Sequence, residues 1–270
     1  MRQYGKVPRF DHTVLPEDFF STGTLHITEK LDGSSFRFFL YETRFSDIYP
    51  SEVAELGPSD GDVVFGSRRK LRGVISDEID SFDGNFHRAV RHLRENVDKE
   101  EIRRITDEYG PVVFFAENMV LHSLDYQYSS SPPPAILGFD IYAPEEDNRK
   151  EPPSDPFKET FEGYLTPKIV FGDGETLGLF ERIGIETVPV IESSIPAGCF
   201  TPSPDSVPKS KFVDRQAEGV VIRHLELCRR AKIVTPEFEE LNRSAFGMRP
   251  SETQDGTELF VATFATNRRI

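Results

Sequence analysis

The segment "ITEKLDGSSF" (27–36) places a lysine where an amine could do chemistry. Apolar residues at alternate positions lead into Lys30, and Asp32 and Gly33 follow as a turn, so the lysine should end a half-buried strand. An amine attacks only when it is neutral, and burial or neighbouring cations lower the ordinary lysine pKa of about 10.4. We therefore expect Lys30 to be a nucleophile with a lowered pKa or the partner of a carboxylate, with an exposed turn lysine as the plainer alternative.

Other charged residues stand at the ends of further apolar runs. Arg68 follows the run "VVFGS", Glu117 ends "VVFFAE" and Glu218 begins "EGVVIR". Arg230 and Lys232 lie two residues apart in "RRAKIV", so a strand would direct both to one face. If these strands converge, the two carboxylates would hold a divalent metal and the cations would clamp a triphosphate.

Hydrophobic patterning predicts the elements that position these side chains. Strands are predicted over 24–41 (two, around the Lys30 turn), 61–73 (one, ending in an arginine-rich loop), 111–118, 135–142, 187–191, 218–224 and 229–234. Helices are predicted over 84–109 (one or two), 174–184 and 236–246, where Pro236 suits the first helical position. Residues 143–156 read as a polar loop. Without a regular alternation of strand and helix, the pattern favours an α+β fold with largely antiparallel sheets.

Composition limits the function classes only in part. The chain has 270 residues and a net charge of -14, which is unlike the basic footprint of most nucleic-acid-binding proteins. Either the protein never meets nucleic acid, or an acidic exterior surrounds a locally basic site. The sequence has no run long enough to span a bilayer, no secretory signal and only two cysteines, so we expect a cytoplasmic, monomeric protein without membrane contact.

The ordered series of segments resembles the covalent nucleotidyltransferase superfamily, which includes ATP-dependent polynucleotide ligases and mRNA-capping enzymes. "EKLDGSS" resembles motif I, "FGSR" motif Ia, "FFAEN" motif III, "LGFDIY" motif IIIa, "EGVVI" motif IV and "RRAKIV" motif V. The resemblance extends from about residue 25 to 240. The RNA ligase branch is the most similar, since "AKIVTPEF" also matches its ending. The implied fold is a nucleotidyltransferase (ATP-grasp-like ligase) fold, with sheets flanking a nucleotide cleft.

The resemblance implies a three-step reaction with ATP and Mg²⁺ or Mn²⁺ as cofactors. Lys30 would attack ATP to form a lysyl-AMP, the adenylate would pass to a 5′-phosphate end, and a 3′-OH would then displace AMP. The catalytic residues would be Lys30 and Lys232, the latter on the α-phosphate. The metal would involve Glu117 and Glu218. The resemblance implies that the nucleotide site comprises Glu29 near the adenine edge, Lys30, Asp32, Gly33, Arg68, Glu117, Phe139, Glu218, Arg230 and Lys232.

Departures from the family pattern narrow the expected substrate and leave alternatives open. DNA ligases usually carry arginine five residues after the nucleophile, where this chain has Ser35, which favours RNA ends in a nicked duplex or a single strand. Arg230 stands where several RNA ligases have lysine. We expect a catalytic domain over 1–240 and a short tail over 241–270, with no full OB or helical accessory domain. A compact ATP-dependent DNA ligase and a non-catalytic nucleic-acid end-binding module remain the alternatives.

Overall fold

The computed structural model describes residues 7–11, 15–47, 49, 51–68, 70–75, 85–119, 128, 133–142, 173–227 and 229–246. The predicted loop over 143–156 and the tail beyond residue 246 therefore lie outside the described residues. Helices within the described part are too short or too polar to cross a membrane.

The described chain forms nine strands, five α-helices and three short 3₁₀ helices. The strands are β1 (Thr24–Lys30), β2 (Ser34–Leu40), β3 (Val63–Ser67), β4 (Leu71–Ile75), β5 (Val113–Asn118), β6 (Ile136–Tyr142), β7 (Val190–Pro196), β8 (Gly219–His224) and β9 (Arg229–Val234). The α-helices are α1 (Ser51–Leu56), α2 (His87–Asn96), α3 (Lys99–Tyr109), α4 (Asp173–Arg182) and α5 (Pro236–Phe246). The 3₁₀ helices are Thr43–Phe45, Ala197–Cys199 and Pro204–Ser206.

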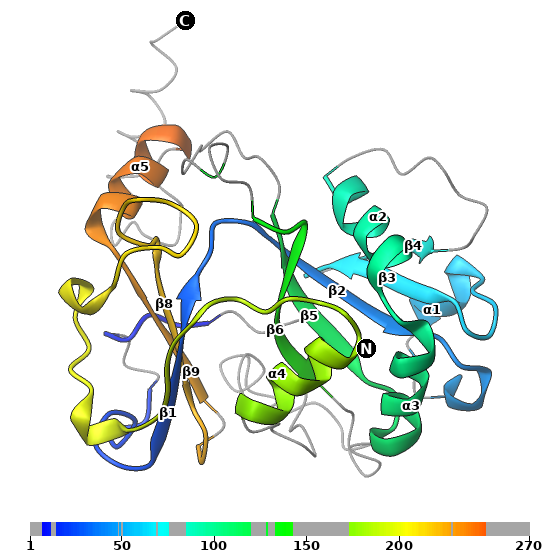
Figure 1. Ribbon diagram of the computed structural model, residues 1–270, viewed down its shortest axis with the longest axis horizontal. Helices are drawn as coiled ribbons and strands as arrows, with labels where there is room; N and C mark the ends of the chain where they lie inside the picture. Colours follow the sequence, from blue (N-terminus) through cyan, green and yellow to red (C-terminus); the bar gives the residue numbers. More distant parts are fainter. Residues whose placement is uncertain are drawn as a thin grey trace, which may run out of the picture.

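The strands form two antiparallel sheets that are joined through the turn after Lys30 (Figure 1). Sheet A has the order β7-β1-β8-β9, and sheet B has the order β4-β3-β2-β5-β6. β1 belongs to sheet A and β2 to sheet B, so residues 31–33 carry the chain from one sheet to the other. The prediction of an α+β fold with largely antiparallel sheets is confirmed.

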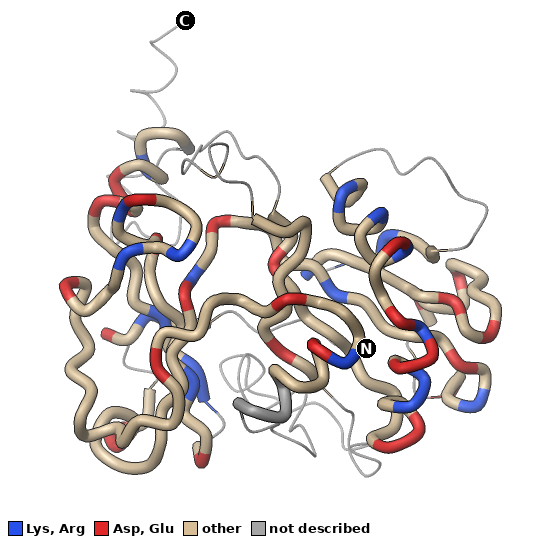
Figure 2. The backbone as a smooth tube through the Cα atoms, viewed as in Figure 1, with Lys and Arg blue, Asp and Glu red and all other residues tan. Residues whose placement is uncertain are grey.

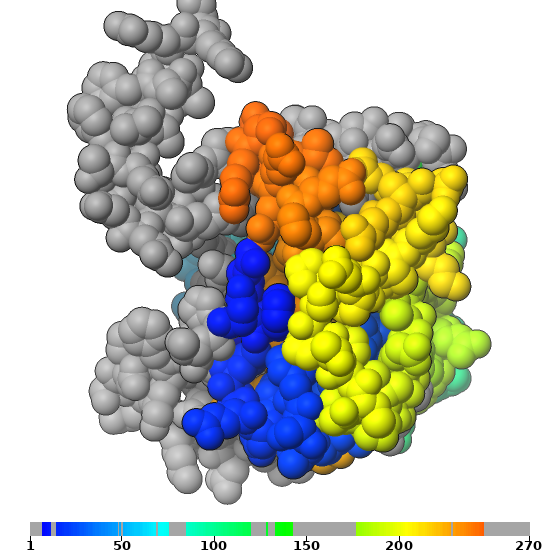
Figure 3. All heavy atoms as spheres, turned by 90° about the vertical axis from the view of Figure 1, so that its left-hand side faces the viewer, coloured from blue at the N-terminus to red at the C-terminus, as the bar shows by residue number. Residues whose placement is uncertain are grey.

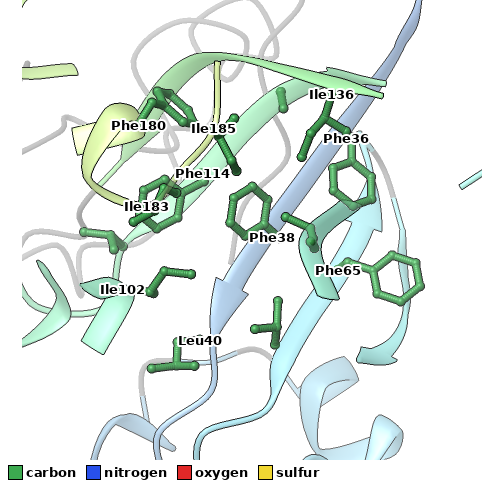
Figure 4. Packing of buried hydrophobic residues seen from close by; sticks show 14 of the residues in the cluster. Phe36, Phe38, Leu40, Phe65, Ile102, Phe114, Ile136, Phe180, Ile183 and Ile185 are labelled. Atoms are coloured by element: carbon green, nitrogen blue, oxygen red, sulfur yellow. The ribbon is translucent and has the colours of Figure 1, made fainter. Parts of the chain in front are cut away.

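Sheet B buries one face against α2, α3 and α4. Alternate residues of its strands point to this face and form the largest apolar cluster with the helices, as the side chains in Figure 4 show. Phe38 of β2 stacks on Phe114 of β5 with ring centroids 5.1 Å apart, and Phe180 of α4 meets Phe114 edge to face. Aromatic residues favour strands because their rings fill such an interface. Phe36, Phe38, Phe65, Phe114 and Phe180 thus serve this core.

Alternation along β1 divides its residues between a core and the site. Leu25 and Ile27 point into the apolar cluster of sheet A, which also contains residues of β8 and β9. Residues of opposite parity, among them Thr28 and Lys30, point to the other face of the sheet. The strand pattern therefore explains why Lys30 leaves the core although its strand is largely buried.

The structure differs from the sequence prediction at two elements. The segment after Arg68 returns as a second strand, β4, rather than as a loop only. β7 begins at Val190, three residues later than predicted, because residues 186–188 pair with β6 instead. The region predicted as one or two helices contains two, which are separated at Asp98; its side chain caps α3 by accepting a hydrogen bond from the Glu101 N–H at 3.1 Å.

Candidate active site

Lys30, the last residue of β1, forms an ion pair with Glu218 through its ammonium group. The antiparallel register pairs Lys30 with Gly219 at the start of β8, so Glu218 stands immediately before that partner. A Cβ on Gly219 would lie 2.1 Å from the Ile233 carbonyl oxygen, so glycine is required where β8 and β9 approach. Of the alternatives predicted for Lys30, the structure shows the second, because its amine pairs with the buried carboxylate of Glu218.

Glu117 reaches the same place from sheet B. It pairs with Ser35 across β5 and β2, two residues beyond the turn that follows Lys30. The Gly33 N–H donates a hydrogen bond to its carboxylate, and a Cβ on Gly33 would lie 2.6 Å from Glu117 Cγ. Glycine at position 33 is therefore what allows the Glu117 side chain to approach the turn so closely.

The charges around Lys30 shift one another's pKa values. Burial raises the pKa of Glu117 to about 8, against the opposing charge of Lys30 and with the help of the Glu218 and Asp32 charges. Burial also raises the pKa of Glu218. Burial lowers the pKa of Lys30, but the Glu218 carboxylate, together with Glu117 and Asp32, outweighs that effect and raises it. The expectation of a lowered lysine pKa is therefore wrong for this structure, because carboxylates surround the amine where cations were expected. Figure 2 shows acidic (red) and basic (blue) positions following one another along the backbone where the chain leaves β1.

Lys232 faces the same side of sheet A as Lys30. The register pairs Lys232 with Val221 and Val221 with Thr28, so Lys232 lies across β8 from Thr28, the residue two positions before Lys30. Its charge lowers the pKa of Glu218, which means that the two side chains are close enough to interact. The structure thus brings together Lys30, Asp32, Glu117, Glu218 and Lys232 of the predicted set.

Glu29 lies on the opposite face of β1 from Lys30. Its carboxylate accepts a hydrogen bond from the Lys211 N–H at 3.0 Å, and Ser210 donates another from its side chain. Burial raises the pKa of Glu29. Among the described residues, its buried Oε1 has no hydrogen-bond partner, so one acceptor remains for a donor from outside. That acceptor is compatible with the predicted contact to adenine.

Arg230 points to the predicted face but is held by Asp140. Its guanidinium forms an ion pair with one carboxylate oxygen, while Arg223 binds the other at 3.0 Å. Arg223 also donates to the Phe139 carbonyl at 3.0 Å. Arg230 therefore ties β9 of sheet A to β6 of sheet B in this structure, which is a role that its spacing from Lys232 does not reveal.

The remaining predicted residues, Phe139 and Arg68, occupy less central places. The Phe139 ring packs against an apolar cluster that includes Leu31, Leu137 and Phe238. Arg68 directly follows Ser67, whose partner in β2 is Phe36, so Arg68 lies at the site end of sheet B. Neither position conflicts with nucleotide binding.

Sequence reasoning missed two residues that contact the site. Phe238 of α5 lies with its ring centroid 5.8 Å from the Lys30 Nζ, and Arg223 shares Asp140 with Arg230. The spacing of Arg223 from Val221 could have revealed its face, since strand residues two apart point the same way. Phe238 could not be found from periodicity, because α5 and β1 are distant in sequence.

The carboxylates of Glu117 and Glu218 are suitable donors for a divalent metal. In the described part of the chain, no group of three or more acidic, histidine or cysteine side chains is arranged to hold a metal ion. Glu117 and Glu218 nevertheless flank Lys30, and the buried Oε2 of Glu218 has no hydrogen-bond partner among the described residues. Mg²⁺ is commonly bound by one or two carboxylates together with substrate phosphates and water. The residues therefore fit a metal that arrives with a nucleotide.

Comparison with known proteins relates this site to a family. The family model described as RNA ligase matches residues 23–234. A search of curated proteins finds no match.

Solved structures of an RNA ligase from Naegleria gruberi share the fold. The structure of that ligase with PPi superposes with a TM-score of 0.55 at 13% identity, over 88% of this chain and 57% of that chain. A mutant with ATP and Mn gives a TM-score of 0.52 at 13% identity, over 88% and 58% of the two chains. An apo mutant gives 0.51 at 14% identity, over 90% and 57%. The chain thus matches less than two thirds of the length of these relatives.

Proposed function

Because the chain belongs to the RNA ligase family, we propose that it is an ATP-dependent RNA ligase that joins 3′-OH and 5′-phosphate ends. The observation that carries the proposal is the partly buried ion pair between Lys30 and Glu218, flanked by Glu117 and Lys232. An amine held among carboxylates and a second lysine suits an attack on a nucleotide that arrives with a metal. The partner would be an RNA end, in a nicked duplex or a single strand.

In the proposed first step, the neutral Nζ of Lys30 attacks the α-phosphorus of ATP. A P–N bond forms as the bond to the β-phosphate oxygen breaks, and pyrophosphate leaves. A 5′-phosphate oxygen then displaces the lysine to give an adenylylated end. Finally, the 3′-OH attacks that 5′-phosphorus, losing its proton as the phosphodiester forms and AMP leaves.

Each charged residue at the site has its own role in the proposed reaction. Lys30 carries a proton that has to leave before attack, and Glu218 accepts the hydrogen bond from that ammonium. Lys232 would contact the α-phosphate and balance the charge that develops there. Glu117 and Glu218 would hold Mg²⁺ or Mn²⁺, which when bound would neutralise phosphate charge and favour the neutral amine. The Naegleria mutant solved with ATP and Mn supports these cofactors.

We also infer a nucleotidyltransferase fold of the ATP-grasp-like type. Two antiparallel sheets that meet at the turn after the reactive lysine support this inference, as does the TM-score of 0.55 with the Naegleria ligase. The nucleotide would bind where the two sheets meet, beside Lys30.

Labelling with α-³²P-ATP and Mg²⁺ tests the function. The wild-type protein should retain label after denaturation, and Lys30→Ala should abolish it. Arg104→Ala is the control, because this cation is 72% exposed and pairs with Glu101 on α3. A wild-type protein that takes no label from any nucleotide would favour an end-binding module.

Nicked duplexes then separate the two kinds of ligase. Duplexes with RNA at the 3′-OH side should be sealed faster than all-DNA duplexes. Equal or faster sealing of all-DNA nicks would instead support a compact DNA ligase.

A further inference from the structure

The backbone of Lys232 is held by an N-terminal segment that the family motifs do not include. Arg9 forms a parallel bridge with Lys232 at the outer edge of β9. The Lys232 N–H donates to the Pro8 carbonyl at 2.8 Å, and the Phe10 N–H donates to the Lys232 carbonyl at 2.9 Å. We call residues 7–11 the N-terminal strap.

These two hydrogen bonds are the ladder bonds of residue 232. In a strand, the N–H and C=O of one residue point to the same side, so both groups of Lys232 face the strap rather than β8. Lys232 is opposite Val221 in β8, and this pair is therefore of the non-hydrogen-bonded kind. The strap thus fixes the backbone from which the Lys232 side chain extends.

A side-chain contact fastens the strap to α5. The Arg9 guanidinium forms an ion pair with Glu239, and its Nε also binds Asp11 at 3.2 Å. Figure 3 shows the dark-blue strap lying against the orange helix α5. The residue before Glu239 is Phe238, which is 3% exposed and lies against the Lys30 amine. One ion pair therefore connects the support of Lys232 with the helix that borders Lys30.

We propose that Arg9 is a positioning residue that acts through the strap to orient Lys232 for the nucleotidyl transfer. The inference rests on the proposed function for the role of Lys232. The hydrogen-exchange experiment described next tests the strap itself and does not depend on the proposed function. A misplacement of about 1 Å can cost about 100-fold in rate, so a loosened strap should lower the rate of adenylylation more than the affinity for ATP.

Hydrogen exchange tests the placement of the strap. Phe10→Pro removes the donor to the Lys232 carbonyl, whereas Phe10→Ala keeps that donor and removes only the ring. We expect the Lys232 amide to exchange about tenfold faster in Phe10→Pro than in Phe10→Ala. Equal exchange in the two variants would overturn the structural basis of the proposal. If Phe10→Pro does not fold, Arg9→Ala serves instead, with faster exchange expected at the Lys232 amide and unchanged exchange contradicting the proposal.

Single-turnover adenylylation tests the action through Lys232. Arg9→Ala should lower the rate at saturating ATP about tenfold with little change in KM, and Arg9→Lys should restore much of it. In a Lys232→Arg background, Arg9→Ala should have a clearly smaller effect, because the oriented group is already altered. Arg104→Ala, at an exposed arginine that pairs with Glu101 on α3, is the matched control.

The outcomes separate this inference from the proposed function. Equal effects of Arg9→Ala in both backgrounds, or an effect on KM alone, would overturn the positioning role. A wild-type protein that takes no label would contradict the proposed function, while the exchange at Lys232 would still report on the strap.

Discussion

Gly33 and Glu117 fit together only because residue 33 has no side chain. A Cβ on Gly33 would lie 2.6 Å from Glu117 Cγ and 2.8 Å from its Oε1. The backbone of Gly33 also donates a hydrogen bond to this carboxylate. The turn after Lys30 therefore determines the position of a carboxylate from the other sheet.

Replacing Gly33 with alanine should displace Glu117 while leaving the fold intact. We expect Gly33→Ala to lower lysyl-adenylate formation by about tenfold or more, since small displacements in a reactive site are costly. Gly178→Ala is the control, because a Cβ there meets nothing within 4 Å. Equal rates in the two variants would show that the Glu117 position does not matter for the first step.

The raised pKa of Glu117 should make stability depend on pH. Between the ordinary value of 4.5 and about 8, the folded state keeps a proton that the unfolded state has lost. Stability therefore falls as pH rises through this window, by at most about 1.4 kcal/mol per unit. In EDTA, Glu117→Gln should thus be more stable than wild type at pH 8 and lose most of this advantage at pH 5. Urea unfolding at both pH values provides the measurement, and a pH-independent difference would contradict the raised pKa.

Removing Asp140 should destabilise the junction of the two sheets. Its carboxylate is 4% exposed and neutralises Arg223 and Arg230, so Asp140→Ala leaves two guanidinium groups without their carboxylate. We expect a loss of about 3 kcal/mol in the free energy of unfolding. Asp214→Ala is the control, since this carboxylate is 93% exposed and should change stability little. A similarly small effect at both sites would mean that the Asp140 pairs contribute little.

Divalent metal should be required for labelling by ATP. EDTA should abolish lysyl-adenylate formation, and added Mg²⁺ or Mn²⁺ should restore it. Glu117→Gln should raise the metal concentration needed for half-maximal rate by about tenfold. Glu226→Gln is the control, because Glu226 binds Thr24 at the far end of β1. An unchanged metal requirement in Glu117→Gln would remove Glu117 from the metal site.

Local patterns predicted the strand that carries Lys30 and the residues on its face. Alternation placed the end of β1 correctly at Lys30, and the two-residue spacing of Arg230 and Lys232 placed both on one face of β9. These predictions succeed because the period of a strand is a local property of the chain.

Contacts between segments that are far apart in the sequence could not be predicted from local patterns. The ion pair of Arg230 with Asp140 joins two sheets, and the bridge of Arg9 to Lys232 joins segments more than 200 residues apart. The expected lowering of the Lys30 pKa failed for the same reason, because it depends on which charges the fold assembles around the amine. Sequence spacing gives the face of a side chain, and tertiary structure gives its neighbours.

The crossing segment between β6 and β7 limits how this protein can open. Gly138 of β6 donates to the Glu186 carbonyl at 2.8 Å, while the Pro189 carbonyl accepts from the Glu29 N–H of β1 at 2.9 Å. The segment 186–189 is thus hydrogen-bonded to sheet B at Glu186 and to sheet A at Pro189, so the sheets cannot separate along it without breaking main-chain hydrogen bonds. Under the proposed function, an RNA end would therefore have to bind through rearrangement of side chains and surface loops while these main-chain bonds persist.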